Sequence, residues 1–155
     1  MRIEVAAVGK LKERFWTDAC AEYLKRLRPY AEVVVREADD CNPEACGGVT
    51  RALLREAAAL ERLVGEGAVR VALDRQGVMS SSEELADWLR ARRDEGARVA
   101  FLVGGPHGLE QATVARCALS LSFGRMTMPH NLARVVLLEQ VYRAFKIMHN
   151  EPYHR

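Results

Sequence analysis

The chain has 155 residues, of which 49% are hydrophobic and 28% are charged, and this composition is typical of one folded globular domain rather than a disordered or fibrous chain. The formal net charge is +2, which excludes nucleic-acid binding through a global positive field and leaves local patches. The first residues include an early acidic side chain and no apolar run long enough for a signal peptide or a membrane span. We therefore expect a single domain over residues 1–155, located in the cytoplasm and without membrane contact.

The first half of the chain alternates predicted strands and helices. The opening segment becomes wholly apolar before Gly9, as a strand entering a sheet does. Apolar residues then recur at helical spacing up to Pro29, and three successive valines follow at 33–35. The predicted elements are strand 2–8, helix 12–27, strand 32–36, loop 39–48, helix 50–64 and strand 69–74.

The second half continues the same alternation. Ser81 and Glu84 form a capping-box pattern that predicts the start of a helix reaching Arg93. The continuous apolar run from Val99 to Val103 is typical of a strand covered on both faces. The remaining predicted elements are helix 109–116, strand 118–122 and helix 132–149. Strands that alternate with helices predict an α/β sandwich with a mostly parallel sheet.

The cysteines and the basic runs offer few distinct signals. Cys20, Cys41, Cys46 and Cys117 show neither a C-x-x-C pair nor a histidine at zinc spacing. We therefore expect reduced structural thiols and no metal site. The basic runs at 25–28 and 90–93 are interpreted as solvated helix ends, with RNA contact as the alternative.

Two loops that follow predicted strands are the candidate ligand sites. Glycines at 104, 105 and 108 come directly after the most apolar strand, where backbone can approach a small molecule. A tight turn without a ligand is the alternative. The pattern is neither a dinucleotide fingerprint nor a P-loop. The second loop covers 123–130, and the two loops could meet in one pocket. Within it, methionines are more often core residues, and His130 fits a capping or packing role better than that of a base.

The last helix and the tail suggest contacts beyond one sheet face. The helix is apolar around most of its circumference, so it must be covered on more than one side, by the core or by a second subunit. After it, Tyr153, His154 and Arg155 supply a stacking ring, a group that titrates near neutrality and a phosphate contact. A frayed terminus is the alternative for these three residues.

Motifs over nearly the whole chain carry a resemblance to a known family. They are Val8-Gly9-Lys10-Leu11-Lys12, Leu73-Asp74-x-x-Gly77, Val103-Gly104-Gly105-x-x-Gly108, Met126-Thr127-Met128-Pro129-His130, the run from Arg134 to Ile147, and Pro152-Tyr153-His154-Arg155. In their order and spacing the chain resembles the RlmH family of SPOUT methyltransferases. The resemblance implies an α/β fold with a C-terminal trefoil knot, a homodimer, S-adenosylmethionine as methyl donor, and methylation at N3 of a pseudouridine in large-subunit ribosomal RNA on assembled ribosomes.

The resemblance and the chemistry of the tail together assign candidate site residues. By analogy with the family, the cofactor would be bound by Leu73, Gly104, Phe123, Gly124, Arg125, Met126, Thr127 and Met128. Removal of the N3 proton needs a base or a nearby positive charge, and the catalytic candidates are Tyr153, His154 and Arg143. The candidates for RNA contact are Arg155 and His130. The alternatives are a SPOUT methyltransferase acting on another RNA, such as transfer RNA, and a non-catalytic ribosome-associated binding protein.

Overall fold

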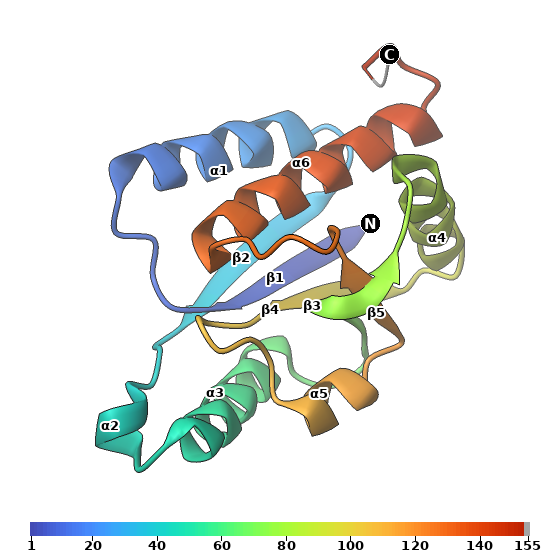
Figure 1. The fold of residues 1–155 in the computed structure, drawn as a ribbon. Coiled ribbons are helices and arrows are strands. Elements are labelled where there is room, and N and C mark those ends of the chain that lie inside the picture. The colour runs from blue at the N-terminus through green and yellow to red at the C-terminus, as the bar shows by residue number, and fades with distance from the viewer. Residues whose placement is uncertain (154–155) are drawn as a thin grey trace.

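The computed structural model describes residues 1–153 and has a five-stranded sheet at its centre (Figure 1). The strands are β1 (Arg2–Val8), β2 (Glu32–Ala38), β3 (Ala68–Met79), β4 (Arg98–Val103) and β5 (Leu119–Ser122). Their order across the sheet is β2-β1-β4-β3-β5, and all four pairings are parallel. The predicted α/β class with a parallel sheet is therefore confirmed.

Helices cover both faces of this sheet. They are α1 (Arg14–Leu27), α2 (Pro43–Cys46), α3 (Val49–Val64), α4 (Ser82–Asp94), α5 (Gln111–Ala115) and α6 (His130–Met148). On one face α6 packs between α1 and α4, and α3 and α5 lie on the other face (Figure 1). The final helix therefore has neighbours on both sides as well as the sheet beneath it, which accounts for its broad apolar surface.

The core has one layer on each face of the sheet, and successive residues of the central strands alternate between them. Ile3, Val5 and Phe101 belong to the layer under α1, α4 and α6. Ala6 and Leu102 belong to the layer that contains Leu60 and Val64 of α3. All the residues from Val99 to Val103 are buried, which confirms the expectation of a strand covered on both faces.

Strand β3 is longer than predicted. The sequence places its end at Asp74, whereas the structure continues it to Met79 through a register shift against β5 between Leu73 and Val78. The irregularity allows the chain to leave the ladder and pair with β5 again. Gly77 is required there, because a Cβ at this position would lie 2.6 Å from the carbonyl oxygen of Ser120.

The segment predicted as a loop over 39–48 contains the short helix α2. The Asn42 side chain caps it by accepting a hydrogen bond from the backbone N–H of Glu44 (3.0 Å), and Gly47 ends it with a φ of 79°. The helix brings Cys41 and Cys46 together in a disulfide, with their Cα atoms 6.4 Å apart. The prediction of four reduced thiols is wrong for this pair, because the spacing in sequence does not reveal the turn. Cys20 and Cys117 are free.

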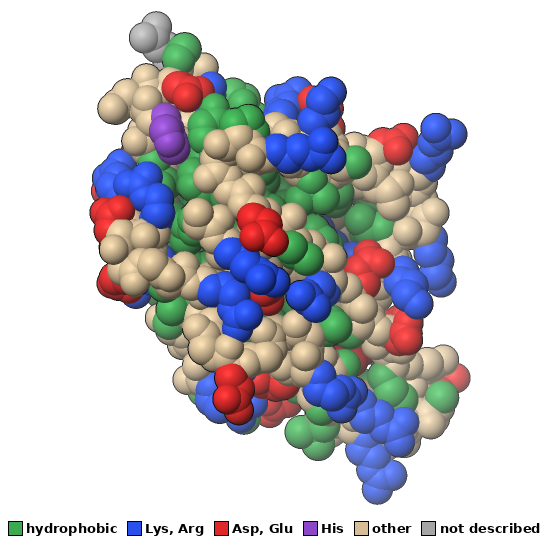
Figure 2. Space-filling view, turned by 180° about the vertical axis from the view of Figure 1, so that it is seen from behind, with side chains coloured by type: hydrophobic (Ala, Val, Ile, Leu, Met, Phe, Trp, Pro, Cys, Tyr) green, Lys and Arg blue, Asp and Glu red, His purple; other side chains and the backbone are tan. Residues whose placement is uncertain are grey.

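The two basic runs lie at helix ends, as interpreted from the sequence. Lys25 and Arg26 are in the last turn of α1, and Arg92 and Arg93 are in the last turn of α4. On the face seen in Figure 2, Lys and Arg side chains form separate groups with acidic side chains between them. Among the helices of residues 1–153, none is long and apolar enough to cross a membrane.

Candidate functional site

The carboxyl ends of three neighbouring strands are level with one another. Leu73 of β3 is paired with Val103 of β4 on one side and with Leu121 of β5 on the other. The segments that begin at Gly104 and Phe123 therefore leave the sheet at the same edge. In open α/β sheets this edge is where small molecules bind, so the predicted glycine loop and the 123–130 loop lie at the expected place.

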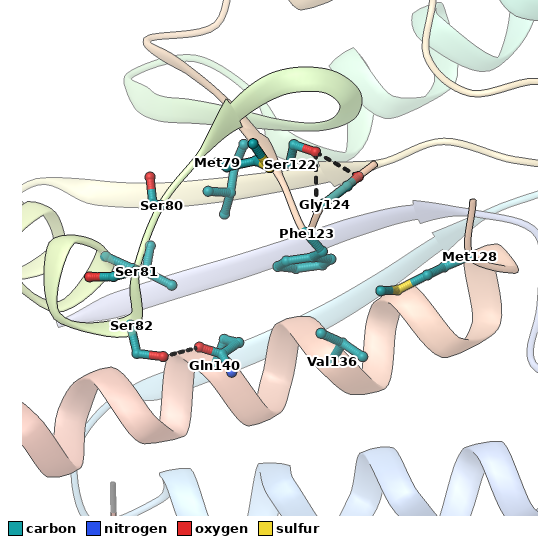
Figure 3. Close-up of a pocket in the computed structure, with 12 residues that line it drawn as sticks. Met79, Ser80, Ser81, Ser82, Ser122, Phe123, Gly124, Met128, Val136 and Gln140 are labelled. Atoms are coloured by element: carbon teal, nitrogen blue, oxygen red, sulfur yellow. Dashed lines mark hydrogen bonds between the residues drawn. The ribbon is translucent and has the colours of Figure 1, made fainter. Parts of the chain in front are cut away.

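A pocket of about 410 Å³ opens between the end of β5, the start of α4 and the side of α6 (Figure 3). This volume is in the range of small-molecule sites. Its walls are mainly apolar, with hydroxyl and amide groups at one end. The lining residues are Met79, Ser80, Ser81, Ser82, Leu85, Leu121, Ser122, Phe123, Gly124, Met128, Val136 and Gln140.

Hydrogen bonds hold the pocket walls in place. The Ser122 hydroxyl lies 3.1 Å from the carbonyl oxygens of both Arg75 and Gly124 and accepts from the Gly124 N–H at 3.2 Å. It therefore joins the 74–77 segment to the 123–128 segment. At the start of α4 the capping box between Ser81 and Glu84 is formed in both directions, which confirms that prediction and fixes the serine-rich end of the pocket.

The predicted cofactor residues divide into three groups. Phe123, Gly124 and Met128 line the pocket. Arg125, Met126 and Thr127 belong to the same loop but are exposed, and Met126 has 81% of its surface accessible. Leu73 and Gly104 lie at the same edge of the sheet and do not line the pocket. Leu73 is half-buried and packs against the core.

The glycine loop folds back on itself. A Cβ at Gly104 would lie 2.3 Å from the carbonyl carbon and oxygen of Gly108, and the N–H of Gly108 donates to the carbonyl of Gly105 at 3.0 Å. Gly104 is therefore needed to close a tight turn at this position. A Gly104→Val variant would not keep this fold intact, because any side chain there meets the backbone of Gly108.

His130 belongs to a second cluster, around the ends of β1 and β2. It begins α6, and its Nε2 lies 3.5 Å from the position that a Cβ would take at Gly9. Burial, and secondly the charge of Arg134, lower the pKa of His130, so the imidazole is largely neutral at pH 7. Pro129 is the N-cap of α6, so of the two predicted roles His130 has packing rather than capping. It does not line the pocket.

Arg134 is the centre of this second cluster and is buried, with 1% of its surface exposed. Its guanidinium donates to the carbonyl oxygens of Val8 (2.6 Å) and Gly9 (2.5 Å) and to the carboxylate of Glu37 (2.7 Å). A buried charge is tolerated where it is paired and hydrogen-bonded. The N-terminal part of α6 is thereby joined to the ends of β1 and β2.

The tail is packed against α6 as far as Tyr153, so the frayed-terminus alternative is wrong for the described part. Glu151 accepts hydrogen bonds from the Tyr30 hydroxyl (2.7 Å) and from the ammonium of Lys146. The Tyr153 hydroxyl donates to Glu139 Oε1 at 3.3 Å, and Arg143 lies 4.9 Å from the centroid of the Tyr153 ring. The predicted residues Arg143 and Tyr153 are thus together. His154 and Arg155 lie outside the described residues.

The environment of Tyr153 keeps its phenol neutral. Burial raises its pKa to about 12, with further contributions from hydrogen bonding to Tyr23 and from the nearby Glu139 carboxylate. The same carboxylate, through its hydrogen bonds, raises the pKa of Arg143. At neutral pH the tail therefore presents an uncharged aromatic donor beside a permanent cation.

The sequence analysis did not assign Ser80, Ser82, Val136 or Gln140 to a site, and all four line the pocket. Of the three serines at 80–82, Ser81 was interpreted through its capping role alone, and Ser80 was given no role. Gln140 lies within the motif from Arg134 to Ile147, where the apolar pattern of the helix dominates. The signal that could have found it is an amide in the middle of a helix whose buried residues, apart from Arg134, are apolar.

Comparison with known proteins gives full-length matches. Residues 1–154 match the family model described as "Predicted SPOUT methyltransferase". The chain is 46% identical to "Ribosomal RNA large subunit methyltransferase H" of Pelotomaculum thermopropionicum, over 98% of both sequences. It is 43% identical to the protein of the same name in Carboxydothermus hydrogenoformans, over 100% of both.

Solved structures share the fold. A probable methyltransferase from Bordetella pertussis superposes with a TM-score of 0.57 at 16% identity, covering 93% of this chain and 94% of that one. TrmJ from Z. mobilis superposes with a TM-score of 0.53 at 17% identity, covering 100% of this chain and 73% of that one. At such identities the likeness concerns the fold alone.

Proposed function

This chain belongs to the SPOUT methyltransferase family, and from that premise we propose that it methylates N3 of a pseudouridine in large-subunit ribosomal RNA on assembled ribosomes, with S-adenosylmethionine as methyl donor. The observation that carries the proposal is its identity of 43–46% to four proteins named ribosomal RNA large subunit methyltransferase H. The pocket at the carboxyl edge of the sheet supplies a place for the donor.

The residues of the pocket fit S-adenosylmethionine. Phe123, Met128 and Val136 offer apolar walls for a flat heteroaromatic ring, and the serine hydroxyls offer hydrogen bonds to a polar sugar and amino acid. Apart from its chain neighbours, no atom of residues 1–153 lies within 4 Å of the position that a Cβ would take at Gly124, so the backbone there is open to a ligand. We propose that Phe123, Gly124 and Met128 hold the donor, with Leu73, Gly104, Arg125, Met126 and Thr127 shaping the same edge.

The bound donor supplies an electrophilic methyl group. The chain then has two tasks, which are to hold the nucleophilic nitrogen in line and to favour loss of its proton. The cationic Arg143 is suited to stabilise a deprotonated base. Tyr153 is a neutral phenol at pH 7, and its pKa is raised further, to about 12. It is suited to stack on a flipped base and donate a hydrogen bond, and it cannot serve as the proton acceptor.

The remaining roles in this proposal come from the sequence. His154 accepts the N3 proton directly or through water, and Arg155 and His130 contact RNA. His130 lies at the same edge of the sheet, next to Gly9, which supports a place on the substrate side. Its lowered pKa makes it a neutral hydrogen-bonding group rather than a phosphate cation at neutral pH.

The proposal includes a homodimer and a trefoil-knotted single domain in the cytoplasm. Exposed apolar side chains at the carboxyl edge support a subunit contact there, because apolar surface that is exposed to water favours association between proteins. Val78, Met79 and Met126 are 62%, 63% and 81% exposed. The dimer would place the tail of one subunit beside the pocket of the other. The knot is proposed from the family match alone.

Two measurements test the function. Calorimetric titration should show binding of S-adenosylmethionine to the protein, weakened by Phe123→Ala and unchanged by Phe15→Ala, whose side chain is exposed. Ribosomes lacking the mark should gain one methyl group by mass spectrometry of their RNA. Methylation of transfer RNA instead would favour the other-RNA alternative, and absence of cofactor binding would favour a non-catalytic binding protein.

A further inference from the structure

A chain of hydrogen bonds runs from the wall of the pocket to the tail. Ser82 at the start of α4 donates through Oγ to Gln140 Oε1 at 2.7 Å, as drawn in Figure 3. Gln140 Nε2 then donates to Glu139 Oε2 at 2.7 Å. The other carboxylate oxygen, Oε1, accepts from Arg143 (3.0 and 2.7 Å) and from the Tyr153 hydroxyl at 3.3 Å.

The chemistry of the donors and acceptors fixes the direction of this chain. An ionised carboxylate accepts hydrogen bonds and donates none, so the NH₂ of Gln140 must face Glu139. Its carbonyl oxygen then faces Ser82 and accepts from the hydroxyl. Gln140 therefore satisfies both partners in one orientation of its amide, and no other side chain type of the same shape does so.

Gln140 lies between the pocket and the residue that holds the tail. It lines the pocket, and its neighbour Glu139, whose side chain is 16% exposed, holds both Arg143 and Tyr153. Hydrogen bonds sheltered from water are stronger and influence one another along a chain. A ligand in the pocket lies next to Ser82 and Gln140, which are the first two residues of the hydrogen-bonded chain. Tyr153 is the last residue of that hydrogen-bonded chain.

We propose that Gln140 is a positioning residue that couples occupancy of the pocket to the placement of Tyr153 and Arg143. The inference rests on the proposed function, since it takes the pocket ligand to be S-adenosylmethionine and the tail to act on RNA. With the cofactor bound, Gln140 holds Glu139 in the orientation that keeps Tyr153 against α6. The tail is then in place when the substrate base arrives, and Gln140 itself touches neither base nor methyl group.

Three variants separate this role from simple packing. Gln140→Leu removes both hydrogen bonds at nearly constant volume. Gln140→Glu keeps the acceptor for Ser82 and sets two carboxylates against each other. The double variant Glu139→Gln with Gln140→Glu exchanges donor and acceptor and restores every hydrogen bond in the chain. Gln111→Glu is the matched control, because Gln111 is exposed on α5, on the opposite face of the sheet.

The readouts are cofactor affinity, ribosome methylation and the fluorine NMR signal of Tyr153 in fluorotyrosine-labelled protein, assigned with Tyr153→Phe. In the unmodified protein, S-adenosylmethionine should shift the Tyr153 signal. In Gln140→Leu and Gln140→Glu the cofactor should still bind within about threefold, the signal should not respond, and kcat should fall about tenfold, a typical coupling between sites. The double variant should recover both, and Gln111→Glu should behave as the unmodified protein.

Other outcomes overturn the inference. If Tyr153 responds to the cofactor in Gln140→Leu as it does in the unmodified protein, Gln140 does not couple the two. If cofactor affinity falls more than tenfold in Gln140→Leu, Gln140 is a direct cofactor ligand instead. A double variant as impaired as Gln140→Glu would show that exchanging donor and acceptor does not restore the coupling, and that the charge of Glu139 beside Arg143 is needed instead. Lack of cofactor binding by the unmodified protein is a separate result and overturns the proposed function as well.

Discussion

The ring of Tyr153 lies edge-on to the ring of Tyr142, with the two centroids 4.8 Å apart. This geometry is favourable for aromatic pairs, and it extends the aromatic surface of α6 by one residue from the tail. Because the guanidinium of Arg143 on α6 covers the same ring, packing of the tail brings two proposed functional groups, Arg143 and Tyr153, into contact before any RNA is present. Tyr153 is thus held in place by the protein itself.

The alkaline pH dependence of stability should report this packing. Tyr153 has its pKa raised from 10.0 to about 12, so the folded state holds this proton in a range where the unfolded chain has lost it. Its contribution to stability is therefore complete below pH 10 and is lost as the pH rises toward 12. Tyr153→Phe should show a smaller loss of unfolding free energy over this range. The ultraviolet absorbance of ionised phenols, compared between the two proteins, should lack the last titration step in Tyr153→Phe. An unchanged titration curve would contradict the burial of this phenol.

The glycine loop should not tolerate a side chain at position 104. In Gly104→Ala the new Cβ would lie 2.3 Å from the backbone of Gly108, so we expect a loss of at least about 3 kcal/mol, at the upper end for overpacking. Gly67→Ala is the control, since no atom lies near its Cβ position and its φ of 78° alone is unfavourable; it should cost about 1 kcal/mol. Urea unfolding compares the two. Equal losses of unfolding free energy in Gly104→Ala and Gly67→Ala would mean that the loop at 104 can open to make room for a side chain.

Removal of the Arg134 side chain should be among the most damaging changes in the helix. Arg134→Met would leave the carbonyls of Val8 and Gly9 and the Glu37 carboxylate without their donor, at a cost of about 3–5 kcal/mol for a broken buried pair. Arg14→Met is the control, because the Arg14–Asp18 pair is exposed and should contribute less than about 0.5 kcal/mol. Thermal unfolding of both variants checks this. A mild effect of Arg134→Met would show that the turn after β1 is held by other contacts.

The disulfide leads to a prediction that counts thiols. With Cys41 and Cys46 joined and Cys20 and Cys117 free, the denatured protein should react with a thiol reagent at two cysteines without a reductant and at four with one. The short enclosed loop implies a stabilisation of about 2 kcal/mol from chain entropy. The double variant Cys41→Ser with Cys46→Ser should lose that amount, whereas Cys117→Ser should still form the bond. Four reactive thiols without reductant would restore the expectation of a fully reduced chain.

Local patterns predicted most of the elements of this fold, although they missed α2 and the end of β3. Contacts between distant residues could not be predicted from them. The continuous apolar run at 99–103 and the capping box at Ser81 each reflect interactions within a few residues, and both are confirmed. Arg134, in contrast, has partners 125 and 126 positions earlier in the chain, and no spacing in the sequence indicates them. The glycines at 104 and 105 were interpreted through a ligand because their contact with Gly108 depends on how the loop closes. The site followed the same rule: Phe123, Gly124 and Met128 were found from a motif, and Ser82 and Gln140 become neighbours only when α4 packs against α6.

The hydrogen bonds that Arg134 donates to Val8, Gly9 and Glu37 also have a consequence for synthesis on the ribosome. Strand β1 leaves the exit tunnel before α6, yet the carbonyl oxygens at the end of β1 receive their hydrogen bonds from Arg134 of α6. A nascent chain that stops short of α6 has β1 without the guanidinium that closes it. Completion of the carboxyl edge therefore waits for the synthesis of α6, and fragments released before α6 is made are left open at this edge to proteolysis.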